Sequence, residues 1–217
     1  MYVPKKFQVD DVDLLHRTMR QIGAAAVVSM GPDGIIATHV PIELDSDAGE
    51  NGVIRCHFAR PNPHADTIAA DQELLLIFQG PQGYVTPSWY PSKHRTGRAV
   101  PTWNYIAIHA YGTAETFDDP TKLRAHLAAL TDHFESPYAV PWSLDDAPDG
   151  FIDGMARAIV GIEIQITRLE GKWKLSQNKA PTDAFGVVNG LRAEGGDANN
   201  AMADLVFEAN GSQPLTG

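Results

Sequence analysis

Short apolar runs separated by turn signals dominate the first third of the chain. The run "AAAVVSMG" at 24–31 is followed by "PDG" at 32–34 and then by "IIATHVPIEL" at 35–44. Proline presets φ and glycine tolerates positive φ, so the two runs are predicted to pair as a β-hairpin. After a polar loop, "VIRCHFA" at 53–59 alternates as a half-buried strand does. These segments predict antiparallel β-structure.

Further strand patterns follow along the chain. They are Glu73–Gly80, Gly83–Pro87, Thr102–Phe117, and two strands joined by a Glu-Gly turn within Ala158–Asn178. The chain then has about seven strands joined mostly by turns, which favours an antiparallel barrel or sandwich over a parallel α/β sheet.

Helical patterns flank the predicted strands. Asp10–Gly23 has acidic residues in its first turn and Gly23 as a stop signal. Asp118–Phe134 opens at Pro120 and carries one apolar stripe. Asn62–Gln72 predicts a short helix, and Ala180–Asn210 predicts two more. We therefore expect one domain over residues 1–180, with residues 181–217 as its helical C-terminal extension.

Composition narrows the class of protein. The 217 residues carry a formal net charge of −10, which argues against direct nucleic-acid binding because phosphate backbones select basic surfaces. No apolar run approaches the roughly 20 residues of a membrane span. No signal-peptide core follows Lys5 and Lys6. The single cysteine, Cys56, lies in a strand pattern and is predicted to be a buried, inert thiol. A cytoplasmic protein with no membrane contact is expected.

Several kinds of chemistry lack their sequence patterns. The histidines are scattered, with no H-E-x-x-H and no tight His/Cys cluster, so no metal site is predicted. His126 and His133, seven residues apart on one predicted helix, are expected to be solvated. The chain also lacks G-x-S-x-G, a P-loop and G-x-G-x-x-G, which leaves hydrolase and common nucleotide-binding motifs without support.

The segment "HFARPNPHADT" at 57–67 is the first candidate binding feature. A predicted strand ends near Arg60, and a turn opens a predicted helix at Asn62. A helix N-terminus presents free N–H groups to an anion, and Arg60, Asn62 and His64 would add donors. The alternative is a plain strand–turn–helix connection with an exposed arginine.

An aromatic, basic segment is the second candidate. Residues 74–114 contain no Asp or Glu, although the chain is acidic. The window holds aromatic side chains that could stack on a flat ring and cations that could meet an anion: Trp89, Tyr90, Trp103 and Tyr105, and Lys93, Arg95 and Arg98. The alternative is a loop whose aromatic residues cap the core.

These stretches together resemble the PaiB family of the FMN-binding split-barrel superfamily, described as FMN-binding negative transcriptional regulators. The resemblance rests on "ATHVPIEL" at 37–44, "HFARPNPH" at 57–64, "GYVTPSWY" at 83–90, "VPTWNYIAIHAYG" at 100–112 and "KLSQNK" at 174–179. It implies a mainly β (α+β) fold, a six-stranded antiparallel split β-barrel with flanking helices. It also implies a homodimer with FMN in a cleft between subunits.

The resemblance also implies cofactor-binding residues. The flavin phosphate would lie near Arg60, Asn62 and His64, and His39 and Val40 would lie along the isoalloxazine edge. The other implied residues are Gln79 for the ribityl chain or ring, Trp89, Trp103 and Asn104 in the cleft, and Gln177 and Lys179 at the end of the last strand.

Three functions remain open at this point. The first is a flavin-dependent oxidoreductase that uses a reduced nicotinamide, for which no catalytic residue can be named. Lys93, Arg95 and Arg98 would then be free to bind the nicotinamide cofactor or another anionic molecule. The second is a non-enzymatic transcriptional regulator that acts through a partner. The third is a haem-binding or haem-degrading protein with His39, His57 or His109 as axial ligand.

Overall fold

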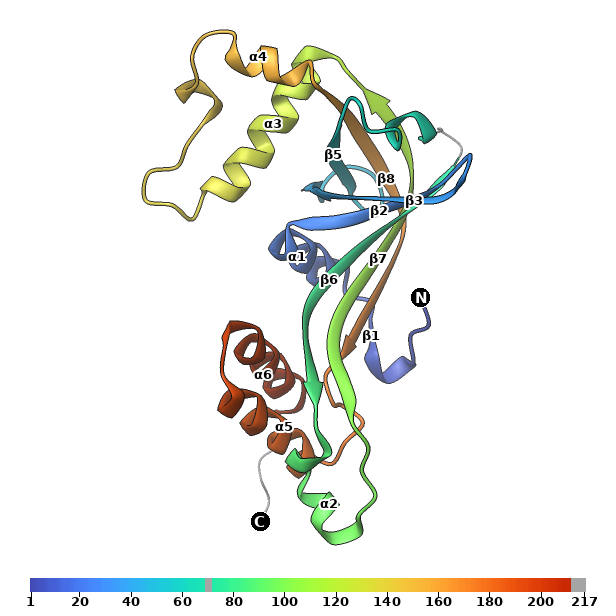
Figure 1. The fold of residues 1–217 in the computed structure, drawn as a ribbon, viewed down its shortest axis with the longest axis vertical. Coiled ribbons are helices and arrows are strands. Elements are labelled where there is room, and N and C mark those ends of the chain that lie inside the picture. Colours follow the sequence, from blue (N-terminus) through green and yellow to red (C-terminus); the bar gives the residue numbers. More distant parts are fainter. Residues whose placement is uncertain (69–71, 212–217) are drawn as a thin grey trace. The chain divides into compact units, whose positions relative to one another are not determined.

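The computed structural model describes residues 1–68 and 72–211, which form two compact units. Unit 1 comprises Met1–Asp10, Gln79–Ile108 and the described residues from Glu170 onwards, and unit 2 comprises Asp11–Phe78 and His109–Leu169. Three long strands contribute residues to both units (Figure 1): β6 (Glu73–Val85), β7 (Thr102–Phe117) and β8 (Ile159–Lys174).

In unit 2, the predicted hairpin is confirmed. Strands β2 (Ala24–Gly31) and β3 (Gly34–Pro41) pair antiparallel from Gly31 opposite Gly34 to Ala24 opposite Pro41. Strand β5 (Val53–Ala59) pairs antiparallel with β4 (Glu43–Asp45) on one side and with β8 on the other. Within the described residues the sheet has the order β3-β2-β6-β7-β8-β5-β4, and β1 (Gln8–Val9) pairs with β8.

The two long helices of unit 2 begin at the capping residues that the sequence indicates, and α1 also ends at its predicted glycine. Helix α1 (Val12–Ile22) is capped by the Asp11 carboxylate, which accepts from Leu14 N at 3.0 Å, and ends at Gly23 with φ of 72°. Helix α3 (Pro120–Glu135) is capped by Asp119, which accepts from Lys122 N at 2.8 Å. The short elements η4 (Leu144–Asp146) and α4 (Phe151–Ala156) follow.

Alternate side chains of β5 build part of the core of unit 2. Ile54, Cys56 and Phe58 are buried, as strand periodicity requires. Burial raises the pKa of the Cys56 thiol to about 12, because an apolar surrounding disfavours the thiolate. The predicted burial of Cys56 is confirmed.

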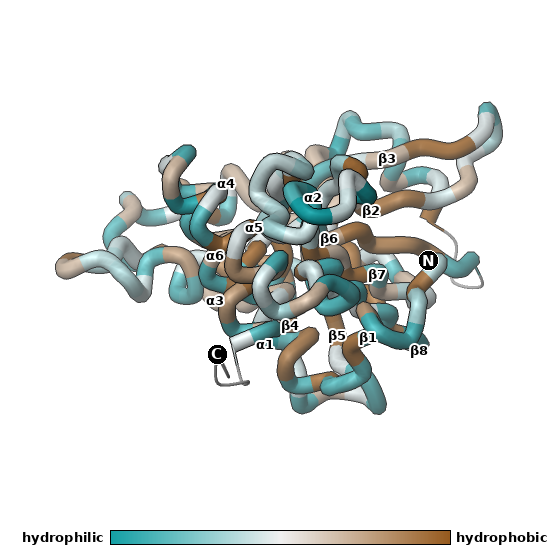
Figure 2. The backbone as a smooth tube through the Cα atoms, turned by 90° about the horizontal axis from the view of Figure 1, so that it is seen from below, coloured by the Kyte–Doolittle hydropathy of each residue, from teal (hydrophilic) through white to brown (hydrophobic). Residues whose placement is uncertain are grey.

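The outward face of β2 and β3 is apolar, and it is exposed in the monomer. Met30 and Ile35, cross-strand partners, are 58% and 75% exposed, and Val28 lies opposite Ala37. Figure 2 shows hydrophobic stretches along β2 and along part of β6. Exposed apolar strands of this kind are typical of surfaces that another chain covers.

In unit 1, the predicted pair of C-terminal helices is confirmed. Helices α5 (Pro181–Glu194) and α6 (Asp197–Asn210) pack against each other and bury Val187, Leu191 and Met202 (Figure 1). The connection between β6 and β7 contains η3 (Pro87–Trp89) and α2 (Pro91–Thr96), and η1 (Lys5–Phe7) precedes β1. Asp183 of α5 accepts from Ser92 N at 2.9 Å and so holds α2.

The structure corrects the predicted turns within the long strands. Residues 73–87 do not form two strands: β6 continues through Gly80 and Gly83. A Cβ at Gly80 would lie 3.0 Å from Ile106 Cβ, and one at Gly83 would lie 3.3 Å from Leu191 Cδ2. These glycines therefore permit close approach instead of making a turn. Likewise, β8 continues through Gly171, which pairs with Val9.

Two helix-based predictions are also wrong. The predicted helix Asn62–Gln72 is only the three-residue 3₁₀ turn η2 (Ala65–Thr67) within the described residues, and positions 69–71 of that prediction lie outside them. His126 is not solvated, because it is 2% exposed and its Nε2 lies 3.0 Å from His57 Nδ1. Within residues 1–68 and 72–211, the short strands β1 and β4 raise the strand number from the expected six to eight. The pairs β1–β8, β2–β3, β2–β6, β4–β5 and β5–β8 are antiparallel, as predicted.

Gly190 provides a test of the packing of α5. A Cβ at Gly190 would overlap the indole ring of Trp89, so Gly190→Ala should destabilise the protein by about 1–3 kcal/mol. Gly154→Ala on α4 is the matched control, because no atom lies within 4 Å of the added Cβ. It should be neutral or stabilising. Urea unfolding followed by tryptophan fluorescence measures both changes in stability. Equal unfolding midpoints for the two variants would contradict the close packing of Trp89 against Gly190.

Candidate functional site

The turn after β5 in unit 2 is built around a buried histidine. His64 is 0% exposed, with Nε2 at 2.9 Å from Ser29 Oγ and Nδ1 at 2.8 Å from Thr38 Oγ1. Asn62 Nδ2 donates to the same Thr38 hydroxyl at 3.1 Å, and Asn62 Oδ1 accepts from His64 N at 3.0 Å. The turn is therefore fastened to β2 and β3 by side-chain hydrogen bonds.

The donors of this turn are already used inside the protein. Burial lowers the pKa of His64, so its ring is kept neutral between the two hydroxyls. The backbone N–H groups of Ala65 and Thr67 donate to the carbonyls of Asn62 and His64. The predicted phosphate site assumed free N–H groups at a helix N-terminus, and η2 does not provide them.

Arg60 is directed to another part of unit 2. Its Nε donates to Arg157 O at 3.0 Å and its Nη2 to Ile159 O at 2.9 Å, while Nη1 lies 3.9 Å from Asp118 Oδ2. Asn62 instead bonds to β3. The structure therefore does not bring the Arg60 guanidinium and the Asn62 amide to the same partners.

His39 and Val40 point to opposite faces of β3. His39 is exposed and lies opposite Ala26, whereas Val40 is 7% exposed and belongs to the core. Of this pair, His39 is the one that can meet a ligand at the exposed apolar sheet face.

A polar pocket of about 190 Å³ is present in unit 1. It lies between the start of β7 and the residues that follow β8. Its lining residues are Val100, Pro101, Thr102, Asn104, Lys174, Ser176, Asn178 and Lys179. Asn104 and Ser176 are 1% and 3% exposed, and Asn104 Nδ2 donates to Ser176 Oγ at 2.9 Å. This buried pair fixes the inner wall of the pocket.

Two lysines give this pocket a positive potential. Lys174 Nζ donates to Thr102 Oγ1 at 2.6 Å and to Trp103 O at 2.7 Å, which leaves one of its three N–H donors for a ligand. Burial lowers the pKa of Lys174, and the charges of Lys172 and Lys179 lower it further, against a raising effect of Tyr105. Lys179 Nζ lies 4.6 Å from the ring centroid of Tyr90. A bound anion would relieve the repulsion between these ammonium groups.

The other predicted residues of unit 1 have different settings. Gln177 closes the turn after β8, because it accepts from Leu175 N and donates to Trp173 O, both at 2.7 Å. Gln79 donates to Ile106 O at 3.3 Å. Trp89 packs on Gly186 and Gly190 of α5, whereas Trp103 is 52% exposed beside Tyr84.

The pocket brings together Asn104 and Lys179 from the predicted set and adds residues that the prediction lacked. The polar additions are Thr102, Lys174, Ser176 and Asn178. Three of these polar additions lie in "KLSQNK", the stretch that carried part of the family resemblance. Ser176 has φ of 66° and is the one non-glycine residue with positive φ in the part of the chain that the structure describes. An irregular backbone of this kind clusters at ligand sites.

The histidines considered as haem or metal ligands do not form a shared site. His57 is hydrogen bonded to His126, which in turn lies 3.3 Å from Glu43 Oε2 through its Nδ1. Over residues 1–68 and 72–211, no group of three or more His, Cys, Asp or Glu side chains could hold a metal ion. No helix in the same residues is long and apolar enough to span a membrane.

The burial of His64 predicts a pH dependence of stability. The folded state keeps the ring neutral, with a pKa below 6.5, whereas an unfolded chain takes up a proton below that pH. The contribution of His64 is therefore complete above pH 6.5 and is lost as the pH falls. The melting temperature should drop between about pH 7.5 and pH 5.5, and His64→Gln should reduce that drop. His39→Gln, at an exposed position, should leave the fall in melting temperature unchanged. An equal fall in the His64→Gln and His39→Gln variants would contradict the assignment of this pH dependence to His64.

Comparison with known proteins identifies the family. A family model described as "Putative FMN-binding domain" matches residues 1–168. The protease synthase and sporulation protein PAI 2 of Bacillus subtilis is 31% identical, with 95% of this chain and 96% of that protein covered. An uncharacterised protein of Emericella nidulans is 37% identical, with 80% of this chain and 82% of that protein covered.

Solved structures share the fold. The FAD and haem binding protein of Mycobacterium smegmatis superposes with a TM-score of 0.56 at 16% identity, and covers 87% of this chain and 80% of that chain. The antiparallel sheet and its flanking helices confirm the predicted split-barrel class. The chain belongs to the PaiB family of FMN-binding split-barrel proteins, and its cofactor is FMN.

Proposed function

We propose that the lysine-lined pocket of unit 1 holds the FMN phosphate and that the protein is a flavin-dependent oxidoreductase. The observation that carries the proposal is the donor set of the pocket: Lys174 and Lys179 beside the buried Asn104–Ser176 pair. A phosphate carries about two negative charges and accepts several hydrogen bonds, so cations and amide or hydroxyl donors suit it. No carboxylate is among the lining residues of this pocket in the described structure.

The turn at Asn62 and His64 fits a phosphate less well. Its hydrogen-bond donors are used internally, and a ligand would have to displace several of them. Breaking a buried hydrogen bond costs about 1–3 kcal/mol for each group left without a partner. We therefore assign this turn to positioning β3 and its exposed His39.

The proposed activity is transfer of two electrons from a reduced nicotinamide to a small acceptor. Bound FMN supplies the redox chemistry, and the protein contributes binding, orientation and electrostatics. Arg95 and Arg98, in and just after α2 of unit 1, are exposed and are proposed to bind the phosphates of the nicotinamide cofactor.

A homodimer is proposed on the basis of the apolar outer face of β2 and β3. Met30 and Ile35 are mostly exposed on an edge of the sheet, and the edge strand β3 has hydrogen-bonding groups along one side. A second copy of the chain would cover this face and remove the edge. His39 lies on the same outward side of β3 as Ile35 and would then lie at or near the subunit interface.

A regulatory role is the second candidate. The relative from B. subtilis is named for protease synthesis and sporulation, and the present chain matches nearly all of it. With a net charge of −10, direct DNA contact is disfavoured, so regulation would act through a partner. The haem alternative rests on a fold-level likeness alone.

Binding of FMN and riboflavin to the same variants tests the phosphate assignment. Lys179→Gln should weaken FMN binding about tenfold and leave riboflavin binding unchanged, because riboflavin lacks the phosphate. Lys179→Arg should retain most of the FMN affinity, and Lys93→Gln is the control for charge in unit 1. Flavin fluorescence titration gives each dissociation constant. If Arg60→Gln loses the discrimination and Lys179→Gln keeps it, the phosphate belongs at the turn.

Consumption of NADH with saturating FMN tests the activity itself. The double variant Arg95→Gln/Arg98→Gln should raise KM for NADH several-fold with kcat and FMN affinity unchanged, since both arginines are proposed to bind ground state and transition state alike. Absorbance of NADH follows the reaction. If the FMN-loaded wild-type protein consumes no NADH, the oxidoreductase proposal fails and the regulatory role remains.

A further inference from the structure

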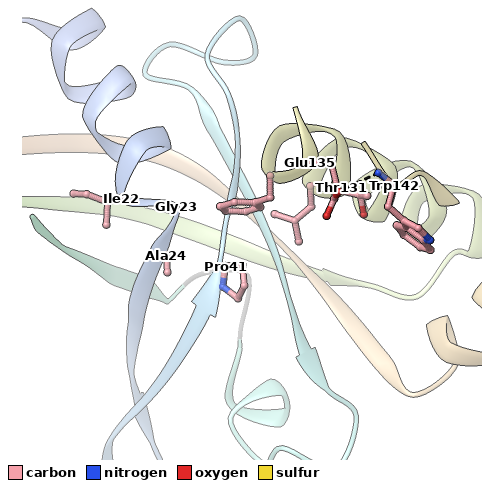
Figure 3. A pocket seen from close by; sticks show the side chains of 9 residues that line it. Ile22, Gly23, Ala24, Pro41, Thr131, Glu135 and Trp142 are labelled. Carbon is pink, nitrogen blue, oxygen red and sulfur yellow. Dashed lines mark hydrogen bonds between the residues drawn. The ribbon is translucent and has the colours of Figure 1, made fainter. Parts of the chain in front are cut away.

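A second cavity, of about 520 Å³, lies in unit 2 and has different chemistry (Figure 3). One wall consists of Ile22, Gly23, Ala24 and Pro41, from the end of α1 and the adjoining ends of β2 and β3. The opposite wall consists of Leu130, Thr131, Phe134, Glu135 and Trp142, from the last turns of α3 and the segment after it. Its volume is in the range of small-molecule sites, about 300–1,000 Å³.

Specific contacts hold the two walls in place. His133 Nε2 lies 3.2 Å from Arg20 O, which ties the last turn of α3 to α1. The Phe134 ring covers Gly23, where an added Cβ would lie 2.8 Å from the ring. The Glu135 carboxylate accepts from Trp142 N at 3.0 Å through Oε2 and so fixes the segment after α3 (Figure 3). The cavity is thus bounded by connected elements on both sides.

The lining combines aromatic surface with one negative charge. Phe134 and Trp142 are each 43% exposed, so their rings can be reached from solvent. Glu135 is the one charged side chain among the nine lining residues, and no partner is present for its Oε1 among the described residues. Aromatic faces attract a cation, and a nearby carboxylate adds an ion pair. The same carboxylate repels anions, so this cavity does not suit the FMN phosphate.

We propose that this cavity binds a small organic cation, an ammonium group attached to an aromatic or aliphatic body. The ammonium would pair with Glu135, and the apolar body would occupy the space between Ile22, Pro41 and Leu130. The net charge of −10 favours the approach of a cation over that of an anion. This site is separate from the lysine-lined pocket and does not depend on the proposed use of FMN.

The test compares two probes of the same shape. Phenethylammonium carries the charge, and 2-phenylethanol does not. Each is titrated into the full-length FMN-loaded protein and followed by Trp142 fluorescence, with Trp142→Phe identifying the signal, and by ligand-observed NMR. The ammonium should bind at least about tenfold more tightly than the alcohol.

Matched variants separate the carboxylate from general charge. Glu135→Gln should weaken phenethylammonium binding about five- to tenfold and leave the alcohol unaffected. Asp132 follows the lining residue Thr131 on α3, but it is exposed and does not line the cavity. Asp132→Asn therefore removes the same charge outside the cavity and should leave the binding of both probes unaffected. FMN content, which both variants should retain, reports that the chain is folded.

Three outcomes would overturn the proposal. They are no binding of phenethylammonium at millimolar concentration, equal binding of the two probes, and equal effects of Glu135→Gln and Asp132→Asn. Leu130→Trp, which fills the cavity, provides a second check that does not alter charge. It should abolish binding of both probes while FMN content stays at the wild-type level, and retained probe binding would place the ligand elsewhere.

Discussion

Buried polar side chains must keep hydrogen-bond partners, and this constraint decides which parts of the protein are free to bind. His64 has the hydroxyls of Ser29 and Thr38 as its hydrogen-bond partners, which fix its ring in unit 2. The buried side chains of Asn104 and Ser176 are hydrogen bonded to each other. The ammonium groups of Lys174 and Lys179, beside this pair, have more N–H donors than they have acceptors within the protein, and their positive charges are not neutralised by a carboxylate of the pocket. A cluster with unused donors can bind an anion at little cost, whereas a closed network has to be broken first.

Much of the fold could be predicted because strand and cap signals are local. Strands β2, β5 and β7 have the predicted bounds, and α1 begins and ends at its capping residues. Glycine caused the main errors, since its role depends on its neighbours in space. At Gly34 it completes a hairpin with φ of 118°, while at Gly80 it makes room for Ile106 inside a continuous strand. No local pattern distinguishes the two uses.

The candidate site was less predictable for a related reason. The phosphate turn was inferred from residue types, yet the side chains of Arg60 and Asn62 bond to different strands. Likewise, His126 looked solvated on helix periodicity, but tertiary packing places it against His57 and Glu43. At "KLSQNK" no periodicity applies, because Ser176 with its φ of 66° leaves regular strand geometry. Which donors are left over after folding depends on contacts far apart in sequence.

The acid-free segment 74–114 gains a physical reason from the pocket of unit 1. Residues 100–102 and Asn104 form one wall of this pocket. Trp89 and Tyr90 serve packing, and Tyr90 is only 1% exposed under the Lys179 ammonium. A carboxylate about 4 Å from a bound phosphate would cost about 4 kcal/mol at an effective dielectric constant of about 20. An acidic residue on this wall would therefore cancel much of what Lys174 and Lys179 contribute.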